Sequence, residues 1–162
     1  MARRAAAAPA AWWAAMALFA LGVVGAALVS QHRFGMEPCA WCVFSRLLFV
    51  GIAAASLVGL AWRQRAGTIV AGMLAVLLAV AGVAASIWQH FVAAASGSCN
   101  LTLADKIVTA TTLGERLPDV FEARASCAEA AVSLLGVPYD FWALAAFVLL
   151  GLGAVALIVR RH

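Results

Sequence analysis

The sequence predicts an all-α membrane protein: a bundle of four transmembrane helices with a long periplasmic loop that carries a short helix. The first observation is composition. Of the 162 residues, 66% are hydrophobic and 11% are charged, whereas a soluble domain is roughly half apolar and a quarter charged. The second is that four apolar runs approach the roughly 20 residues that a helix needs to cross a bilayer. The third is that basic residues lie beside these runs. A chain this short is expected to form a single integral membrane domain over residues 1–162.

The four expected spans follow the apolar runs in chain order. They are residues 12–30, 43–62, 68–91 and 141–159. Alanine, leucine, valine and glycine are abundant in them, and small side chains allow transmembrane helices to pack closely. The first run resembles a signal peptide in following two arginines. However, it exceeds the roughly 7–15-residue apolar core of such peptides, so we expect it to remain as a span.

Arginines at the ends of the spans predict the orientation. Three short clusters lie there: Arg3 and Arg4, Arg63 and Arg65, Arg160 and Arg161. If all three face the cytoplasm, as the positive-inside rule expects, both termini are cytoplasmic. Residues 31–42 and 92–140 are then periplasmic, and the protein is a multi-pass protein of the bacterial inner membrane. The net charge of +4 is explained by this anchoring, so we expect no nucleic-acid partner.

All four cysteines fall in the two outer segments, in a compartment where disulfides form and persist. The close pair, Cys39 and Cys42, follows Pro38, a residue that suits the first helical turn. We expect Cys39 in that turn and Cys42 one turn later, where a helix N-terminus stabilises a thiolate. The alternatives are a structural disulfide or half of a metal site. Haem attachment is excluded because Val43, not histidine, follows the pair.

The second pair, Cys99 and Cys127, lies in a polar loop. A disulfide between them would close a loop of about 30 residues and stabilise the fold by about 3–4 kcal/mol. This wide spacing disfavours a four-cysteine zinc site, so we expect no metal. Residues 120–135 are predicted to form a helix along the membrane surface, with Cys127 inside it. The pair is either a structural staple or a disulfide that a mobile loop presents to an incoming thiol.

Arg46 and His90 are the candidate ligand-binding residues. Arg46 follows Cys42 by four residues, so it lies on the same helix face, about 6 Å deeper. An arginine inside a span indicates function by default, here a partner for a thiolate or a carbonyl group. The alternative is an interfacial anchor. His90, at the outer end of the third span, is either a structural hydrogen-bonding residue or a proton donor to a ligand. His32 is a weaker candidate of the same kind.

Together these motifs resemble a known family. They are Gln31-His32, Pro38-Cys39-x-x-Cys42, Arg46, Trp88-Gln89-His90, Ser98-Cys99, Cys127-Ala128-Glu129, Leu135-Gly136 and Pro138. The set resembles the disulfide bond formation protein B (DsbB) family of bacterial inner-membrane quinone reductases, over most of the chain. Vitamin K epoxide reductase-type enzymes have a related architecture. They place the quinone-side cysteine pair in a late span, which argues against that reading.

The resemblance implies a protein dithiol:quinone oxidoreductase with two redox-active disulfides, Cys39–Cys42 and Cys99–Cys127. A reduced, DsbA-like periplasmic oxidase with a thioredoxin fold would attack Cys99. Cys127 would then exchange with Cys39, and Cys42 would face the quinone. The family's quinone is ubiquinone under aerobic conditions and menaquinone under anaerobic ones.

The same resemblance implies that Arg46 stabilises the quinone or the Cys42 thiolate, with His90 close by. Ser45 stands where the family pattern has an acidic residue, which leaves the local pKa tuning open. The competing hypothesis from a different class is a four-span membrane scaffold or assembly factor. In such a protein the disulfides would only staple the outer loops.

Overall fold

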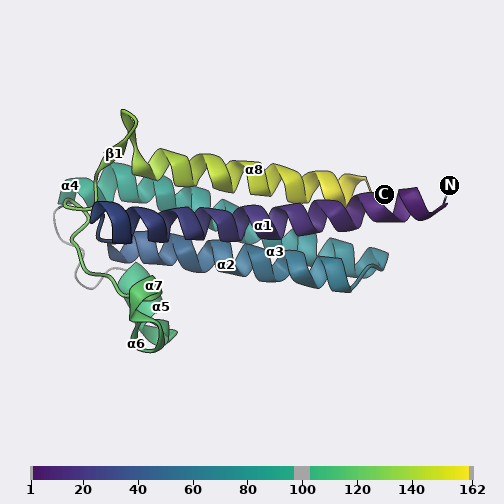
Figure 1. The fold of residues 1–162 in the computed structure, drawn as a ribbon, viewed down its shortest axis with the longest axis horizontal. Helices are drawn as coiled ribbons and strands as arrows, with labels where there is room; N and C mark the ends of the chain where they lie inside the picture. The colour runs from purple at the N-terminus through teal and green to yellow at the C-terminus, as the bar shows by residue number, and fades with distance from the viewer. Residues whose placement is uncertain (1, 97–102, 161–162) are drawn as a thin grey trace.

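A computed structural model describes residues 2–96 and 103–160 of the chain, with a described side-chain environment for residues 10–95 and 103–160. Four long helices run side by side along the molecule (Figure 1). They are α1 (Ala2–Phe34), α2 (Ala40–Ala61), α3 (Arg65–Trp88) and α8 (Tyr139–Val159). Each contains a stretch long and apolar enough to cross a membrane. The predicted class, an all-α four-helix membrane protein, is therefore confirmed.

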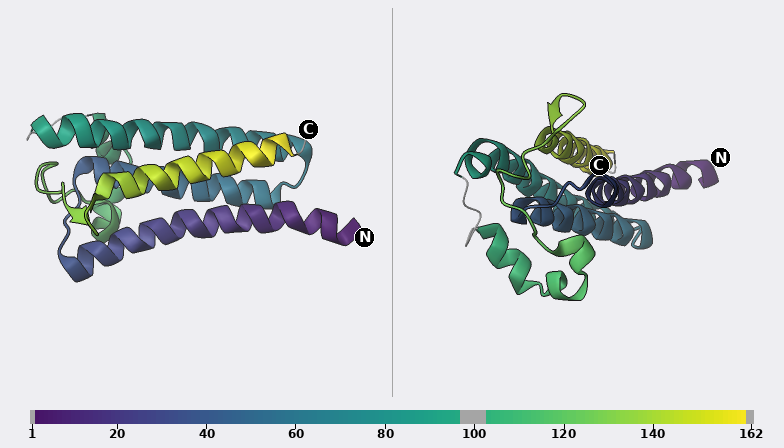
Figure 2. Two further views of the ribbon diagram at one scale, coloured as in Figure 1. Left: turned by 90° about the horizontal axis from the view of Figure 1, so that it is seen from above. Right: turned by 60° about the vertical axis from the view of Figure 1, so that its left-hand side comes forward.

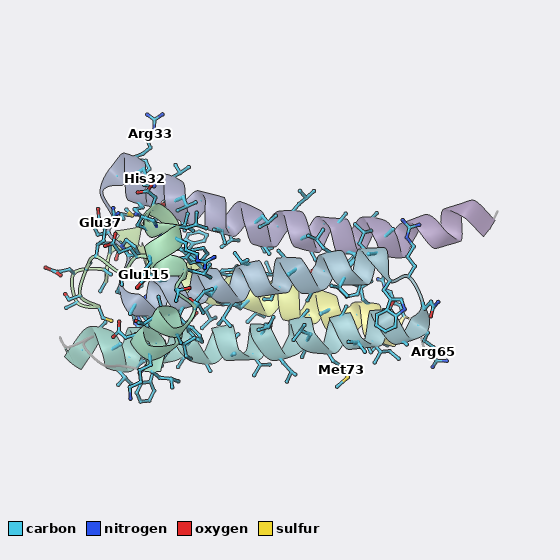
Figure 3. The ribbon with its side chains drawn as sticks, turned by 90° about the horizontal axis from the view of Figure 1, so that it is seen from below. His32, Arg33, Glu37, Arg65, Met73 and Glu115 are labelled. Atoms are coloured by element: carbon cyan, nitrogen blue, oxygen red, sulfur yellow. The ribbon has the colours of Figure 1, made fainter. Side chains whose placement is uncertain are left out.

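The four helices pack in a closed arrangement. Helix α2 packs against both α1 and α3, α3 packs against α8, and α8 also touches α1. Figure 2 shows the bundle from above and turned toward its outer end. Both chain ends lie at the same end of the bundle (Figures 1 and 2). In Figure 3, Arg65 lies at that end, whereas His32, Glu37 and Glu115 lie at the opposite end.

Small residues allow α3 and α8 to approach closely. A side-chain carbon added at Gly82 of α3 would overlap the ring of Phe147 on α8. That ring stacks on Phe49 of α2, with centroids 3.9 Å apart and planes 6° from parallel. The missing side chain at Gly82 therefore makes room for the aromatic pair that joins three helices. Large apolar side chains on the outer face of α3 point away from the bundle, as Met73 does in Figure 3, toward the expected lipid.

At the outer end, α3 continues into a π-helical turn, η1 (Gln89–Ala93), and a short α4 (Ala94–Ser96). From residue 103 on, the loop before α8 carries three short helices and a two-stranded hairpin. These are α5 (Leu103–Ala110), α6 (Leu113–Arg116), α7 (Pro118–Phe121), β1 (Ser133–Leu134) and β2 (Val137–Pro138). Val108 and Phe121 from this loop are buried in one cluster with Val43 of α2. Apolar burial therefore holds the loop against the bundle.

The helix predicted over residues 120–135 is wrong. Helix α7 ends at Phe121, and the chain then runs without a helix to the hairpin. The backbone N–H groups of Arg124 and Ala125 donate to the Pro38 carbonyl at 2.9 and 3.2 Å. These groups therefore bond across the fold, where a helix would require bonds to the preceding turn. The apolar spacing of this segment could not reveal a competing partner more than eighty residues earlier in the chain.

Candidate redox site

The close cysteine pair lies at the outer end of α2. Cys39 is the N-cap residue, with φ −85° and ψ 172°, and its sulfur accepts a hydrogen bond from the Cys42 N–H at 3.4 Å. The prediction placed Cys39 inside the first turn, but its extended backbone puts it one residue before the helix begins. The two sulfurs are 2.9 Å apart, and both cysteines are free thiols. Little movement is required to join them.

The two sulfurs differ in their surroundings. Cys39 has no exposed surface. Its pKa is raised because its thiol is hydrogen-bonded to the Cys42 sulfur and because burial disfavours a thiolate. Cys42 is partly exposed and lines two cavities. Cys39 is therefore the sulfur that keeps its proton, and Cys42 is the one that a small molecule can reach.

Cys127 lies close to the pair. It is disulfide-bonded and buried in one contact cluster with Cys39, Ala104 and Ala130. Cys99 lies outside the described residues. The fold therefore brings at least three of the four predicted cysteines to one end of the bundle. Within residues 2–96 and 103–160, no three His, Cys, Asp or Glu side chains gather where they could hold a metal ion.

Arg46 lies one turn below Cys42 and is 6% exposed. Its Nη1 donates to the side-chain oxygen of Gln31 in α1 at 2.9 Å and to the backbone carbonyl of Val120 in α7 at 2.7 Å. A guanidinium has five N–H donors, so these two bonds leave donors for a further acceptor. Arg46 thus joins α1, α2 and the loop, and it also lines both cavities beside Cys42.

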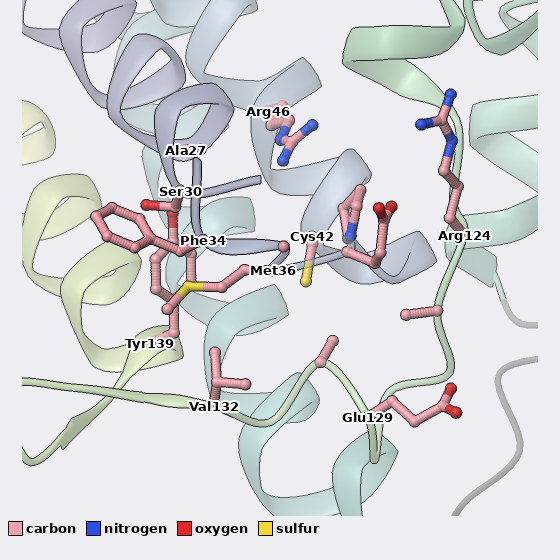
Figure 4. Close-up of a pocket in the computed structure, with 15 residues that line it drawn as sticks. Ala27, Ser30, Phe34, Met36, Cys42, Arg46, Arg124, Glu129, Val132 and Tyr139 are labelled. Carbon is pink, nitrogen blue, oxygen red and sulfur yellow. The ribbon is translucent and has the colours of Figure 1, made fainter. Parts of the chain in front are cut away.

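The outer cavity has a volume of about 460 Å³. Figure 4 shows Cys42 and Arg46 of α2 around this hollow, together with Ser30 of α1 and Tyr139 of α8. Loop residues close its rim, including Glu129.

The deeper cavity has a volume of about 250 Å³ and lies between α1, α2 and α8. Its walls are mostly apolar, with Val23, Phe49 and Trp142 among them. Cys42 and Arg46 are among its polar lining residues, as are Gln89 and Asp140. An apolar hollow with a small number of placed polar groups is the usual form of a small-molecule site.

His90 lies near this site but lines neither cavity. Its side chain is 31% exposed, and its Nδ1 lies 3.4 Å from Oδ2 of Asp140. Its ring also contacts Phe91 and Phe141. The predicted ligand role of His90 stays a prediction. His32 is exposed at the outer end of α1.

Two residues near Cys42 were given no role from the sequence. Asp140, in the first turn of α8, is 6% exposed, and Gln89 of η1 donates to its Oδ1 at 2.5 Å. The same Gln89 nitrogen lies 3.3 Å from the Cys42 sulfur. One signal was available: an acidic residue next to an apolar span is costly unless it is paired. Its partners could not be read from the sequence.

Comparisons with known proteins agree with this arrangement. Residues 9–157 match the family described as disulfide bond formation protein DsbB. Disulfide bond formation protein B of Ralstonia nicotianae is 33% identical over 148 residues, covering 91% of this chain and 92% of that protein. Disulfide bond formation protein B 1 of Pseudomonas savastanoi pv. phaseolicola is 32% identical, covering 91% and 88%. Disulfide bond formation protein B of Cupriavidus necator is 30% identical, covering 94% of both chains. This chain has four helices able to span a membrane and a cysteine pair at one end of their bundle, and it matches the family over nearly its whole length. It therefore belongs to the DsbB family.

Proposed function

We propose that this protein is a protein dithiol:quinone oxidoreductase. It reoxidises a DsbA-like periplasmic thiol oxidase and passes the electrons through two cysteine pairs to a membrane quinone. The observation that carries the proposal is the contact of the Cys39 and Cys42 sulfurs beside an apolar cavity that Arg46 also lines. Membership of the DsbB family supports exchange with a DsbA-like partner.

The proposed entry of electrons is through a Cys99–Cys127 disulfide. A thiolate of the reduced partner attacks Cys99, and the freed Cys127 thiol then exchanges with the Cys39–Cys42 disulfide at Cys39. The burial of Cys127 and Cys39 in one cluster supports this second exchange, because the exchange requires the two residues to lie near each other. That exchange joins Cys127 to Cys39 and frees Cys42. The partner's second thiol then displaces Cys99 from the mixed disulfide, and the Cys99 thiol attacks Cys127, which frees Cys39. Cys39 and Cys42 are left as the pair of thiols that the structure contains.

The deeper cavity suits the head group of ubiquinone or menaquinone. Its walls are mostly apolar, its volume of about 250 Å³ is smaller than most drug-sized pockets, and part of its lining, including Val23 and Phe49, comes from the expected spans. A bound quinone would accept the two electrons and two protons given up as the two thiols close to a disulfide. Arg46 would donate to a carbonyl oxygen, and Cys42 would be the sulfur facing the ring. His90 is proposed to assist from the edge of the site.

The proposed location is the bacterial inner membrane, with the cysteines in the periplasm and both termini in the cytoplasm. Both termini lie at one end of the bundle (Figure 1), and the cysteine pair lies at the start of α2, at the other end, which supports this location. Arg65 marks the terminal end in Figure 3, as the positive-inside rule expects for the cytoplasmic side. The chain is proposed to act as one integral membrane domain.

The test is quinone reduction by the purified full chain with a reduced DsbA-like protein, followed by ubiquinol formation. We expect turnover in the native protein and none in Cys42→Ser, while Ser56→Ala, which changes a buried position of α2 that lines neither cavity, retains turnover. A folded native sample that reduces neither ubiquinone nor menaquinone with any DsbA-like partner would support the scaffold hypothesis instead.

The order of the cysteines has a separate test. We expect Cys127→Ala to accumulate a mixed disulfide when it is mixed with the oxidised partner: its free Cys99 thiolate opens the partner's disulfide, one partner sulfur leaves as a thiol, and no Cys127 thiol is present to displace the partner. Cys99→Ala should accumulate none. Non-reducing gels followed by peptide mapping measure both. Trapping that persists in Cys99→Ala would reverse the assignment of the entry cysteine.

A further inference from the structure

A buried carboxylate lies beside the close cysteine pair. Asp140 is 6% exposed, in the first turn of α8, and accepts hydrogen bonds on both oxygens. Gln89 donates to Oδ1 at 2.5 Å, and Nδ1 of His90 lies 3.4 Å from Oδ2. A buried acid is costly unless it is paired and hydrogen-bonded. Both partners are consecutive residues of the π-helical turn η1, and such turns occur frequently at functional sites.

Gln89 joins Asp140 to the reactive sulfur. A side-chain amide has two N–H donors on its nitrogen and one acceptor on its oxygen. One donor of Gln89 serves Asp140, and the same nitrogen lies 3.3 Å from the Cys42 sulfur. Because an ionised carboxylate only accepts hydrogen bonds, it holds the nitrogen of Gln89 toward itself. The second N–H then faces Cys42. In the opposite orientation, the amide would present its oxygen to the sulfur instead.

We propose that Asp140 is a positioning residue: it fixes the amide of Gln89 so that its second N–H supports the Cys42 thiolate. A hydrogen bond donated to a sulfur favours its charged form, and the thiolate is the reactive form in disulfide chemistry. The buried Cys39 thiol, in contact with the same sulfur, is the other hydrogen-bonding neighbour that the described residues give it. The inference deepens the proposed function and rests on it for its use in turnover. The thiolate content of Cys42, however, is measurable without quinone or partner.

The pH dependence of Cys42 involves several ionisable neighbours. Those that contact it, line its cavities or lie beside Asp140 are Glu37, Cys39, Arg46, His90, Arg124, Glu129, Tyr139 and Asp140. Removing the charge of Asp140 alone would therefore mix two effects. The loss of a nearby negative charge would favour the thiolate, and the loss of the Gln89 orientation would disfavour it. A double-variant comparison separates them, because the charge effect is common to both members of each pair.

The experiment uses the full chain, reduced, freed of reductant and labelled with iodoacetamide between about pH 5 and 10. Mass spectrometry of the Cys42 peptide gives the midpoint of its labelling profile. Gln89→Met removes the donor without adding charge, and we expect it to raise the midpoint by about one to two pH units. In an Asp140→Asn background the same Gln89→Met change should shift the midpoint by less than half as much, because the amide is no longer held.

Two results would overturn the proposal. If Gln89→Met leaves the midpoint unchanged in the native background, Gln89 does not support the thiolate. If it shifts the midpoint equally in both backgrounds, Asp140 does not position Gln89. Gln89→Leu also lacks N–H donors and adds no charge, so it repeats the test with the same expected direction if Gln89→Met lowers helicity. Ser86→Ala, which removes a hydroxyl one turn before Gln89 and lines neither cavity, is the matched control and should not move the midpoint.

The measurement separates this inference from the proposed function. If Gln89→Met shifts the Cys42 midpoint as expected but the native protein reduces no quinone, the positioning role stands and the oxidoreductase proposal is refuted. If the native protein reduces quinone but Gln89→Met does not shift the midpoint, the oxidoreductase proposal stands and the positioning role is refuted.

Discussion

Replacing Arg46 with alanine should release the outer loop from the bundle. The guanidinium is buried and bonds both to Gln31 in α1 and to the Val120 carbonyl in α7. Arg46→Ala removes both bonds and leaves the side-chain oxygen of Gln31 and the backbone carbonyl of Val120 without this donor. The bond to Val120 is 2.7 Å long and charge-assisted, and of the two it is the bond that reaches the loop.

The size of the effect follows from that bond. A hydrogen bond to a charged group contributes about 1.5–3 kcal/mol. Taking about 2 kcal/mol, local opening of the loop becomes about 30-fold more frequent. The N–H groups of Arg124 and Ala125, which donate to the Pro38 carbonyl, report this opening. Their amide hydrogen exchange should therefore be about 30-fold faster in Arg46→Ala, as local opening controls exchange in such segments.

Hydrogen exchange with mass spectrometry of the peptide that covers these amides provides the measurement. The matched control is Arg33→Ala, which removes the same charge from an exposed position at the outer end of α1. Exchange that is equally slow in Arg46→Ala and the native protein would refute the docking role. A raised apparent KM for quinone in Arg46→Ala would report the separate ligand role proposed for its remaining donors.

Two further predictions concern packing and pH. Gly82→Ala should lower the thermal unfolding temperature in detergent, because its new side chain overlaps Phe147 and overpacking costs about 1–3 kcal/mol. Gly22→Ala, whose side chain would meet nothing within 4 Å, should leave that temperature unchanged or raise it. Hydrogen bonds from Ser126 lower the pKa of Glu129 below its ordinary 4.5. The protection of the Ser126 amide, corrected for intrinsic exchange, should therefore be full above about pH 4.5 and decline as pH falls through the lowered pKa. Glu129→Gln should remove that decline; a decline that persists would assign it to another group.

The bundle and the place of the cysteine pair were predictable because their signals are local and strong. Four long apolar runs leave few alternatives in a bilayer, where a backbone must satisfy its own hydrogen bonds. The proline before Cys39 marked the start of α2 to within two residues. Arg46 was correctly expected one turn below Cys42, because helical spacing fixes that relation.

The loop and the Asp140 contacts were not predictable for the opposite reason. Whether residues 120–135 form a helix depends on the Pro38 carbonyl, which captures two N–H groups of the loop. The link from Asp140 to Cys42 depends on a π-helical turn and on the packing of α8 beside α3. Both are consequences of tertiary structure, and hydropathy and motif spacing carry no information about them.

The unequal surroundings of the two close sulfurs bear on the direction of electron transfer under the proposed function. Cys39 is fully buried, holds its proton and shares a cluster with Cys127, so its neighbours are those of an exchange partner for the loop. Cys42 is partly exposed, lines the apolar cavity and accepts a hydrogen bond from Gln89. A symmetric pair could give its electrons from either sulfur. Here the sulfur with access to the cavity is also the one with a donor for its charged form. If Gln89→Met moves the Cys42 labelling midpoint while labelling of Cys39 stays low throughout, the Gln89 side chain accounts for the difference between the two sulfurs. Equal labelling of both sulfurs in the native protein would remove the physical basis for a fixed direction of electron transfer.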